Sequence, residues 1–327
     1  MKRSIFIILS AFGIMTLLAT PMAFGATSFP QKEITLEVGF PAGGGADMVA
    51  RSLAAGAEKI LGEKILVVNK PGAGGAVAAA LLSRSRPDGY TILLTTDTPF
   101  ARAPHMRRLS YDPMKAFTFI ERVGVFKCGF AVLENSPFKS WKGLVKWAKK
   151  HPDQLKYGSP PPGTTPDLAM TLIAKKEGFT YRSSPFKGEA PLFTALLGGH
   201  LDVAGGTAAA WSNYVRAKKM RVLLLFEQNK AYPNIPTFKD EGYNLELPLG
   251  IFIYGPAGIP ANIVDKLSQA FAQAARSKTF QNVAKTIGLA DIDQPLAGAA
   301  LDKYVIRNYE LYKEYFSEAG LLKKKNK

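Results

Sequence analysis

The sequence predicts an α/β protein organised in two lobes, and three observations lead to this class. Strand-like segments alternate with helix-like segments almost from end to end. About 300 residues follow a leader-like start, which is enough chain for two ordinary domains with cores of their own. No low-complexity linker and no internal repeat divides the chain, so two domains must be joined by short crossings.

The expected strands are short, rich in β-branched or aromatic residues, and closed by Gly, Pro, Asp or Ser. The first begins at Ile34, and the others span 64–69, 90–95, 129–133, 157–159, 182–185, 203–205, 222–226 and 250–254. The clearest helices span 141–150 with Ser140 as N-cap, 263–277 after Asn262, and 298–319 near the C-terminus. Their apolar stripes predict core contacts.

The start of the chain has the pattern of a secretory signal peptide. Lys2 and Arg3 precede an apolar run over 5–18, and small residues favour cleavage after Gly25, so residues 1–25 are predicted to be removed. The apolar run is too short for a comfortable membrane span. Cys128 is the only cysteine, which argues against a lipid anchor and an internal disulfide. We therefore expect an exported, soluble, periplasmic protein.

The domain organisation follows from two candidate crossings, around 122–128 and around 245–252. They predict lobe 1 from residues 26–127 plus 246–327, and lobe 2 from residues 128–245. A double crossing makes a hinge and places a cleft between the lobes. Ligands of open α/β sheets bind at the carboxyl ends of strands, so the loops there are the candidate site.

The chain is strongly basic, with a formal net charge of +16. One interpretation is binding to nucleic acid or to a membrane surface. The other, which we favour, is a diffusely basic surface that attracts anions, because charge alone says nothing of the fold. The basic residues are scattered apart from the tail at 323–327 and do not alternate with aromatics. We expect no nucleic-acid partner.

The most informative segment is the apolar run from Ile34 that breaks at Gly43, Gly44 and Gly45 and resumes at helical spacing. This pattern predicts a strand, a loop and the N-terminus of a helix. Glycines let a ligand approach the backbone, and the first N–H groups of a helix have no intrahelical acceptor, so such a turn attracts carboxylate or phosphate oxygens. The alternative is a tight turn without a ligand.

Sequence motifs of enzymes are missing. There is no P-loop, no complete dinucleotide fingerprint, no nucleophile elbow, no His-Glu-x-x-His and no cysteine pair for zinc. His105, expected in a polar loop, has the best chance of a functional role; His151 resembles a solvated helix end and His200 lies in a turn. Cys128 is read as a small buried strand residue. We expect no catalytic set, no cofactor and no metal.

Taken together, the motifs resemble those of the periplasmic substrate-binding receptors of tripartite tricarboxylate transporters, also called Bug-type receptors. The matching segments are, in order, 38–51, 68–75, 87–91, 109–113, 157–159, 185–188 and 197–202. The resemblance covers the whole mature chain. It implies a type II-like periplasmic binding protein fold with two lobes, a hinge and an interlobe ligand cleft, and a protein that passes small carboxylates to membrane permease subunits without enzymatic activity.

The resemblance also assigns ligand-binding positions. From lobe 1 these are Phe40, Ala42, Gly43, Gly44, Gly45, Asp47, Thr96, Asp97 and Thr98. From lobe 2 they are Ser159, Gly163, Thr164, Thr165, Phe186, Lys187, Gly188, Ala190, Gly206 and Thr207. For Asp47 a capping role with Arg51 is favoured over ligand contact, since two carboxylates repel each other. Lys187 is either an anion ligand or a solvated lysine.

Two segments depart from the family pattern. Pro160–Asp167 replaces a Gly-rich segment, and Asp167 stands where a histidine is expected. Thr98-Pro-Phe100 stands where Asn-Pro is common. Trp211 and Phe100 either line a pocket for an aromatic carboxylate or, as we favour, pack in the core. The Gly-rich loop at 72–75 is expected to be structural.

The resulting expectation is a monomeric receptor that captures a dicarboxylate, tricarboxylate or aromatic carboxylate between its lobes and delivers it to a tripartite transporter. Two alternatives remain. The same fold and cleft serve a ligand-sensing receptor for a signalling partner. An exported enzyme would act on an anionic substrate with His105 or Asp97 as base.

Overall fold

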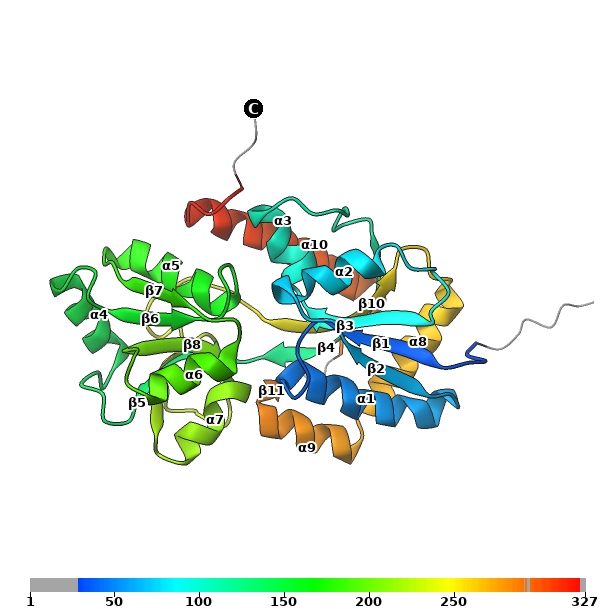
Figure 1. Ribbon diagram of the computed structural model, residues 1–327, viewed down its shortest axis with the longest axis horizontal. Helices are drawn as coiled ribbons and strands as arrows, with labels where there is room; N and C mark the ends of the chain where they lie inside the picture. The colour runs from blue at the N-terminus through cyan, green and yellow to red at the C-terminus, as the bar shows by residue number, and fades with distance from the viewer. Residues whose placement is uncertain (1–28, 291, 293–294, 324–327) are drawn as a thin grey trace, which may run out of the picture.

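The computed structural model describes residues 29–290, 292 and 295–323, and it shows two sheets lying side by side, each flanked by helices (Figure 1). The chain is therefore α/β with two lobes, as the sequence predicts. The predicted signal peptide and residues 324–327 of the basic tail lie outside the described residues. Within the described part of the chain, no helix combines the length and apolar character that a membrane span needs.

The sheet of lobe 1 has six strands in the order β11-β4-β10-β3-β1-β2. Its strands are β1 (Ile34–Val38), β2 (Ile65–Asn69), β3 (Thr91–Thr96), β4 (Phe117–Phe126), β10 (Gly250–Pro256) and β11 (Leu289–Ala290). Strand β1 is parallel to β2 and β3, whereas β10 is antiparallel to both β3 and β4. The carboxyl ends of β1 and β3 therefore share one edge, where the first candidate loops begin.

Helices cover both faces of this sheet. They are α1 (Gly45–Leu61), α2 (Ala76–Leu82), α3 (Ala103–Met106), α8 (Ala261–Ala275), α9 (Lys278–Ile287) and α10 (Gly298–Glu318), with the short 3₁₀ helix η1 (Ala73–Gly75) and the short π-helix η2 (Thr98–Arg102). Helices α1, α8 and α9 share a buried cluster with β1 and β10. On the other face, α2 and α10 pack on β3 and β10.

The sheet of lobe 2 has five strands in the order β7-β6-β8-β5-β9. They are β5 (Cys128–Leu133), β6 (Lys156–Ser159), β7 (Arg182–Pro185), β8 (Val203–Thr207) and β9 (Met220–Leu225). Its helices are α4 (Trp141–Lys150), α5 (Thr165–Glu177), α6 (Glu189–Leu197) and α7 (Ala208–Arg216). Strand β6 is parallel to β7 and β8, so their carboxyl ends also share one edge.

The lobes are connected twice and also pack against each other. Lys127 alone separates β4 from β5, and residues 226–249 return the chain to β10. One buried cluster contains Phe100 and Tyr312 of lobe 1 together with Phe130 and Trp141 of lobe 2. Helix α10 also contacts α5 across the boundary, as their neighbouring ends in Figure 1 indicate. The lobes thus share apolar core in this arrangement.

Two local expectations are wrong, and one long strand was not predicted. The ten-residue strand β4 was not among the predicted strands, because the charged pair Glu121 and Arg122 interrupts its apolar pattern. Helix α8 begins at Ala261 after Pro260, so Asn262 is not its N-cap. His105 lies in the short helix α3 rather than in a polar loop. The predicted cap of α4 is confirmed, since Ser140 accepts a hydrogen bond from the Gly143 N–H at 3.1 Å.

Candidate functional site

The first candidate loop connects β1 to α1 and has the backbone of an anion-binding turn. Gly43 has φ +79°, in the left-handed region that favours glycine, and the extended residue Gly44 is the N-cap of α1 without a side-chain cap. Gly43 and Gly44 are exposed. The first N–H groups of α1 have no intrahelical acceptors, so they are available to a bound carboxylate.

Asp47 holds this loop from inside. Its carboxylate accepts hydrogen bonds from the Gly43 N–H at 2.9 Å, Arg51 Nε at 3.0 Å and Asn69 Nδ2 at 2.9 Å. Burial alone would raise the pKa of Asp47, but these hydrogen bonds outweigh it and hold the pKa below its usual value. Asp47 therefore stays ionised and braces the turn, with both oxygens engaged by donors of lobe 1.

A second loop, between β6 and α5 in lobe 2, has the same construction. Gly163 has φ +78°, and Thr164 is the extended N-cap of α5. Asp167 takes the place of Asp47: it accepts hydrogen bonds from the Gly163 N–H at 2.8 Å and from Ser159 Oγ at 3.2 Å. Each lobe thus carries one strand, turn and helix N-terminus of the same geometry.

The correspondence of the two loops was missed in the sequence, although a signal for it exists. Residues 41–47 and 161–167 share the pattern Pro-x-Gly-x-x-x-Asp. The shared positions are those that the backbone requires: a glycine with positive φ, and an aspartate that bonds back to the N–H of that glycine. Asp167 consequently braces its own loop.

The loops differ in their donors and in their charge. Ala46 of the first loop has an N–H group, whereas Pro166 at the same position of the second has none. Burial raises the pKa of Asp167, against hydrogen bonds from Gly163 and Ser159. Among the described residues, Asp167 has no ion pair comparable to that of Asp47 with Arg51. The Thr164 hydroxyl is buried without a hydrogen-bond partner in the described structure.

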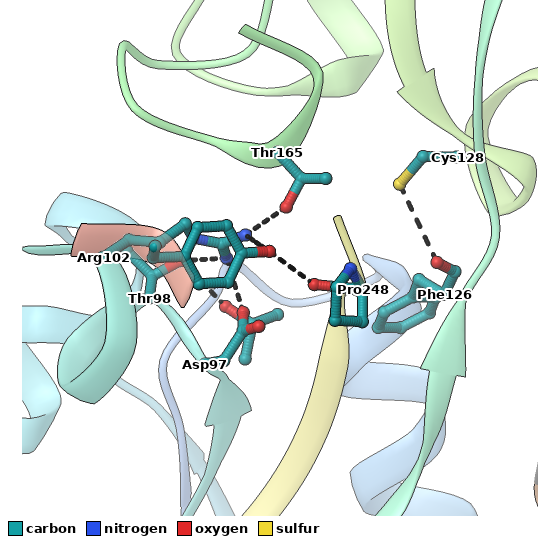
Figure 2. Close-up of polar contacts among 9 residues, drawn as sticks. Asp97, Thr98, Arg102, Phe126, Cys128, Thr165 and Pro248 are labelled. Atoms are coloured by element: carbon teal, nitrogen blue, oxygen red, sulfur yellow. Dashed lines mark hydrogen bonds and ion pairs between the residues drawn. The ribbon is translucent and has the colours of Figure 1, made fainter. Parts of the chain in front are cut away.

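Between the lobes, Arg102 of η2 connects the predicted residues of β3 with the second loop (Figure 2). Its guanidinium forms an ion pair with Asp97 at 2.7 Å and donates a hydrogen bond to Thr98 Oγ1 at 2.6 Å. A further hydrogen bond reaches the hydroxyl of Thr165 in lobe 2. Burial raises the pKa of Asp97 to about 6, although the charge of Arg102 acts in the opposite direction. Thr98 in turn lies 3.1 Å from Thr96, oxygen to oxygen.

The remaining predicted residues fall into two groups in lobe 2. The Thr207 N–H and hydroxyl both donate to the carboxylate of Glu189, at 2.6 and 2.7 Å. Gly206 lies so close to Phe193 that a Cβ there would stand 2.6 Å from the ring. The other group follows β7: Phe186 is half-buried, Lys187 and Ala190 are exposed, and Gly188 is the N-cap of α6.

Two more close approaches link loop segments across the lobe boundary. A Cβ on Gly45 would stand 3.3 Å from Phe126 and 3.5 Å from Ala209 of α7. Within lobe 1, the carbonyl of Phe40 in the same loop accepts a hydrogen bond from Asn69 Nδ2 at 3.0 Å. A Cβ on Gly163 would meet Met106 of α3. Each loop therefore lies against an element of the opposite lobe.

The two loops offer a matched pair of substitutions. Gly43→Ala and Gly163→Ala both place a side chain at the same positive φ, which costs about 1–2 kcal/mol. Only the methyl group at position 163 meets a neighbour, 2.0 Å from Met106 Sδ. Denaturant unfolding should therefore show a loss at least about 1 kcal/mol larger for Gly163→Ala. A Met106→Ala background should remove the difference, and equal losses in the parent would contradict the packing argument.

Two of the histidines, His105 and His151, pack against aromatic residues. The ring of His105 is buried, lies 4.5 Å from that of Tyr309, and has Nε2 3.0 Å from the Tyr309 carbonyl oxygen. Burial is the main cause that lowers the pKa of His105. The ring of His151 stacks on Trp147. Among the described residues, no group of three His, Cys, Asp or Glu side chains is placed to hold a metal ion.

Aromatic residues that were candidates for a pocket pack in the core. Phe100 is fully buried and meets Phe252 edge to face with ring centroids 5.0 Å apart. Trp211 is fully buried and donates to the Gly206 carbonyl at 3.2 Å. The Gly-rich loop before α2 has the conformational role expected of it, since a Cβ on Gly75 would lie 2.1 Å from Thr95 Oγ1.

Comparison with known proteins places the chain among solute receptors. Residues 49–299 match the model of the tripartite tricarboxylate transporter family receptor. A UPF0065 protein from the gbd 5' region of Cupriavidus necator is 36% identical over 269 residues, which cover 82% of each chain. Protein BugT of Bordetella pertussis is 26% identical over 266 residues, covering 80% of this chain and 81% of BugT.

Solved structures agree with this match. The periplasmic binding protein BugD superposes with a TM-score of 0.80 at 28% identity, covering 90% of this chain and 100% of BugD. The R. palustris protein Rpa4515, whose structure contains adipate, superposes with a TM-score of 0.81 at 25% identity, covering 90% and 99%. At the level of the family, these relatives are solute-binding proteins and not enzymes.

Proposed function

The chain belongs to the tripartite tricarboxylate transporter receptor family, and from this premise we propose that it captures a small dicarboxylate in the periplasm and delivers it to the membrane subunits of such a transporter. One observation carries the choice of ligand. Two turns of equal geometry, at Gly43 and at Gly163, stand in different lobes. A molecule with a carboxylate at each end would use both.

Energetics favour two contacts over one. A charge-assisted hydrogen bond contributes about 1.5–3 kcal/mol, whereas micromolar affinity requires about 8 kcal/mol after the costs of association. In the first loop the donors are backbone N–H groups at Gly44 and Gly45. In the second they are those at Thr164 and Thr165, together with the buried Thr164 hydroxyl. Asp47 and Asp167 hold these turns and do not touch the ligand.

The adipate in Rpa4515 supports a dicarboxylate, since adipate has two carboxylates. The other predicted residues take supporting positions in this proposal. Asp97 and Thr98 hold Arg102, and the Thr96 hydroxyl pairs with that of Thr98. Glu189 accepts the hydrogen bonds from both the N–H and the hydroxyl of Thr207. Lys187 is exposed and contributes attraction to anions rather than a fixed contact.

Thermal stability of ligand-stripped protein tests the proposal. The protein is unfolded, dialysed, refolded and heated with succinate, malate, adipate, citrate, benzoate, butyrate or hexanoate. Preferential binding to the native state at 100 times Kd stabilises it by about 2.7 kcal/mol. At least one dicarboxylate should raise the melting temperature, and the monocarboxylate of equal length, such as hexanoate beside adipate, should not. Equal shifts for both would contradict the two-loop site, and no shift with any carboxylate would contradict the receptor function.

Delivery to a transporter and the periplasmic location need a test in cells. Deletion of the gene should abolish uptake of the ligand identified by the thermal assay, and the mature protein should be released with the periplasmic fraction. Normal uptake after deletion, together with ligand-dependent binding to a sensor domain, would instead indicate a signalling receptor.

A further inference from the structure

The bracing of the two loops is asymmetric. In lobe 1 the brace Asp47 forms an ion pair with a residue of the same lobe, Arg51, which lies one helical turn further along α1. The second loop has a brace in Asp167 but, among the described residues, no cation of lobe 2 in an ion pair with it. The cation that reaches this loop comes from lobe 1 and is Arg102.

Arg102 is built to hold a fixed position. Its side chain is 1% exposed and that of its ion-pair partner Asp97 is 0% exposed. The guanidinium carbon lies 5.2 Å from the ring centroid of Tyr312, and Nη1 is 3.5 Å from the Tyr312 hydroxyl. That hydroxyl donates to the carbonyl of Pro248 at 2.7 Å, on the segment that returns from lobe 2. Asp97 and Tyr312 of lobe 1 thus orient the guanidinium, and the return segment in turn holds the Tyr312 hydroxyl.

The group that Arg102 meets in lobe 2 is the first residue of α5. Thr165 is fully buried, and its hydroxyl accepts the hydrogen bond from Arg102 Nη1. Two residues earlier, Gly163 approaches Met106 of lobe 1 so closely that no side chain fits between them. Lobe 1 therefore fixes both the left-handed glycine and the first helical residue of the second loop. Separation of the lobes would break the hydrogen bond and remove this support.

We infer that Arg102 is an interlobe latch: through Thr165 it holds the lobes closed and adds a support from lobe 1 to the second loop, which Asp167 braces within lobe 2. The inference rests on the proposed function where it treats the second loop as a carboxylate-binding turn. The latch itself concerns the arrangement of the lobes in the ligand-free protein. Arg102 acts on the ligand through Thr165 and is a positioning residue. The ion pair that braces the first loop, Asp47 with Arg51, lies within lobe 1.

The test measures the distance between the lobes in the ligand-free full chain. Spin labels are placed at exposed positions by Ala55→Cys on α1 and Lys146→Cys on α4, and Cys128 is buried and unlabelled. The decisive variant is Thr165→Val, which removes the acceptor and keeps the shape of the side chain and the Asp97 ion pair. It should lower the ratio of closed to open molecules about tenfold or more, which is about 1.4 kcal/mol.

Two variants complete the design. Arg102→Met should shift the distances in the same direction, and combined with Thr165→Val it should shift them no more than Arg102→Met alone. Arg51→Met is the matched control, because it removes the cation that braces the first loop within lobe 1 and should leave the distances unchanged. If Arg102→Met does not fold, the distances in Thr165→Val still test whether the latch exists.

The outcomes are distinguishable from those of the ligand assay. Unchanged distances in Thr165→Val, or a parent protein that is already mostly open, would overturn the latch even if dicarboxylates bind. Absence of carboxylate binding would overturn the proposed function and leave the distance measurement valid. Equal shifts in Arg51→Met and Thr165→Val would show a general loosening of the loops and would also overturn the latch.

Discussion

Asp97→Asn should lower the free energy of unfolding by about 3–5 kcal/mol at neutral pH, the cost typical of removing one partner of a buried ion pair. The substitution leaves the Arg102 guanidinium, 1% exposed, without its counter-charge 2.7 Å away. The shape of the side chain is kept, so the loss reports charge and not a cavity. Urea unfolding followed by circular dichroism at pH 7.5 measures it.

The double variant Asp97→Asn/Arg102→Met is the control for this prediction. It removes both charges and leaves an apolar side chain against Tyr312, so it should recover much of the stability lost in the single variant. A double variant that is less stable than Asp97→Asn would contradict the buried-charge argument. It would mean that other contacts of Arg102, with Thr98 and Thr165, dominate.

Glu121 should make the protein lose stability as the pH rises. This carboxyl lies in β4 and is fully buried, and neither oxygen has a hydrogen-bond partner among the described residues. Burial raises the pKa of Glu121 to about 8, against a weaker opposing effect of Arg276. The folded protein therefore holds this carboxyl protonated at neutral pH, whereas the unfolded chain ionises near pH 4.5.

The direction follows from proton linkage. Between the unfolded and folded pKa values the folded state binds more protons, so stability is greatest below about pH 4.5 and falls until the pH passes about 8. At about 1.4 kcal/mol per pKa unit, this group costs the folded state roughly 3 kcal/mol between pH 5 and pH 8. Urea unfolding at pH 5, 6, 7 and 8 measures the slope.

Glu121→Gln tests the assignment, because glutamine resembles the protonated acid at every pH. The variant should unfold at higher urea than the parent at pH 8, with a much smaller difference at pH 5. Glu310→Gln, on an exposed glutamate of α10, is the control and should leave the pH profile unchanged. A parent and a Glu121→Gln variant with parallel profiles would contradict a protonated Glu121.

Much of the site could be predicted from local sequence, because its parts are local. A glycine with positive φ before a helix N-terminus, and an aspartate four residues later, are decided by backbone sterics and helix capping. The ordered motifs indicated the receptor family, and the match over residues 49–299 confirms it. The alternation of strand and helix predicted the α/β class, which the two sheets confirm.

The contents of the interlobe boundary could not be predicted in the same way. Arg102 and Thr165 are 63 residues apart, and Arg102 was not among the candidate residues. Asp97 was assigned to the ligand site through the family resemblance, and only the packing of η2 and α10 reveals that it is buried beside a guanidinium. Strand β4 could not be predicted from the sequence pattern, because the burial of its charged residues Glu121 and Arg122 depends on neighbours distant in sequence.

The sequence by itself thus determined the class of the fold and the family, and it predicted the glycine turn at 43–45 before a helix, since each depends on short-range sterics and on motif order. Tertiary structure decided that the two turns correspond, that Asp47 and Asp167 brace them, and that one arginine crosses between the lobes. The physical reason is range: backbone conformation and capping act over a few residues. Burial, which turns a carboxyl into a brace, an ion-pair partner or a protonated acid, depends on the whole chain.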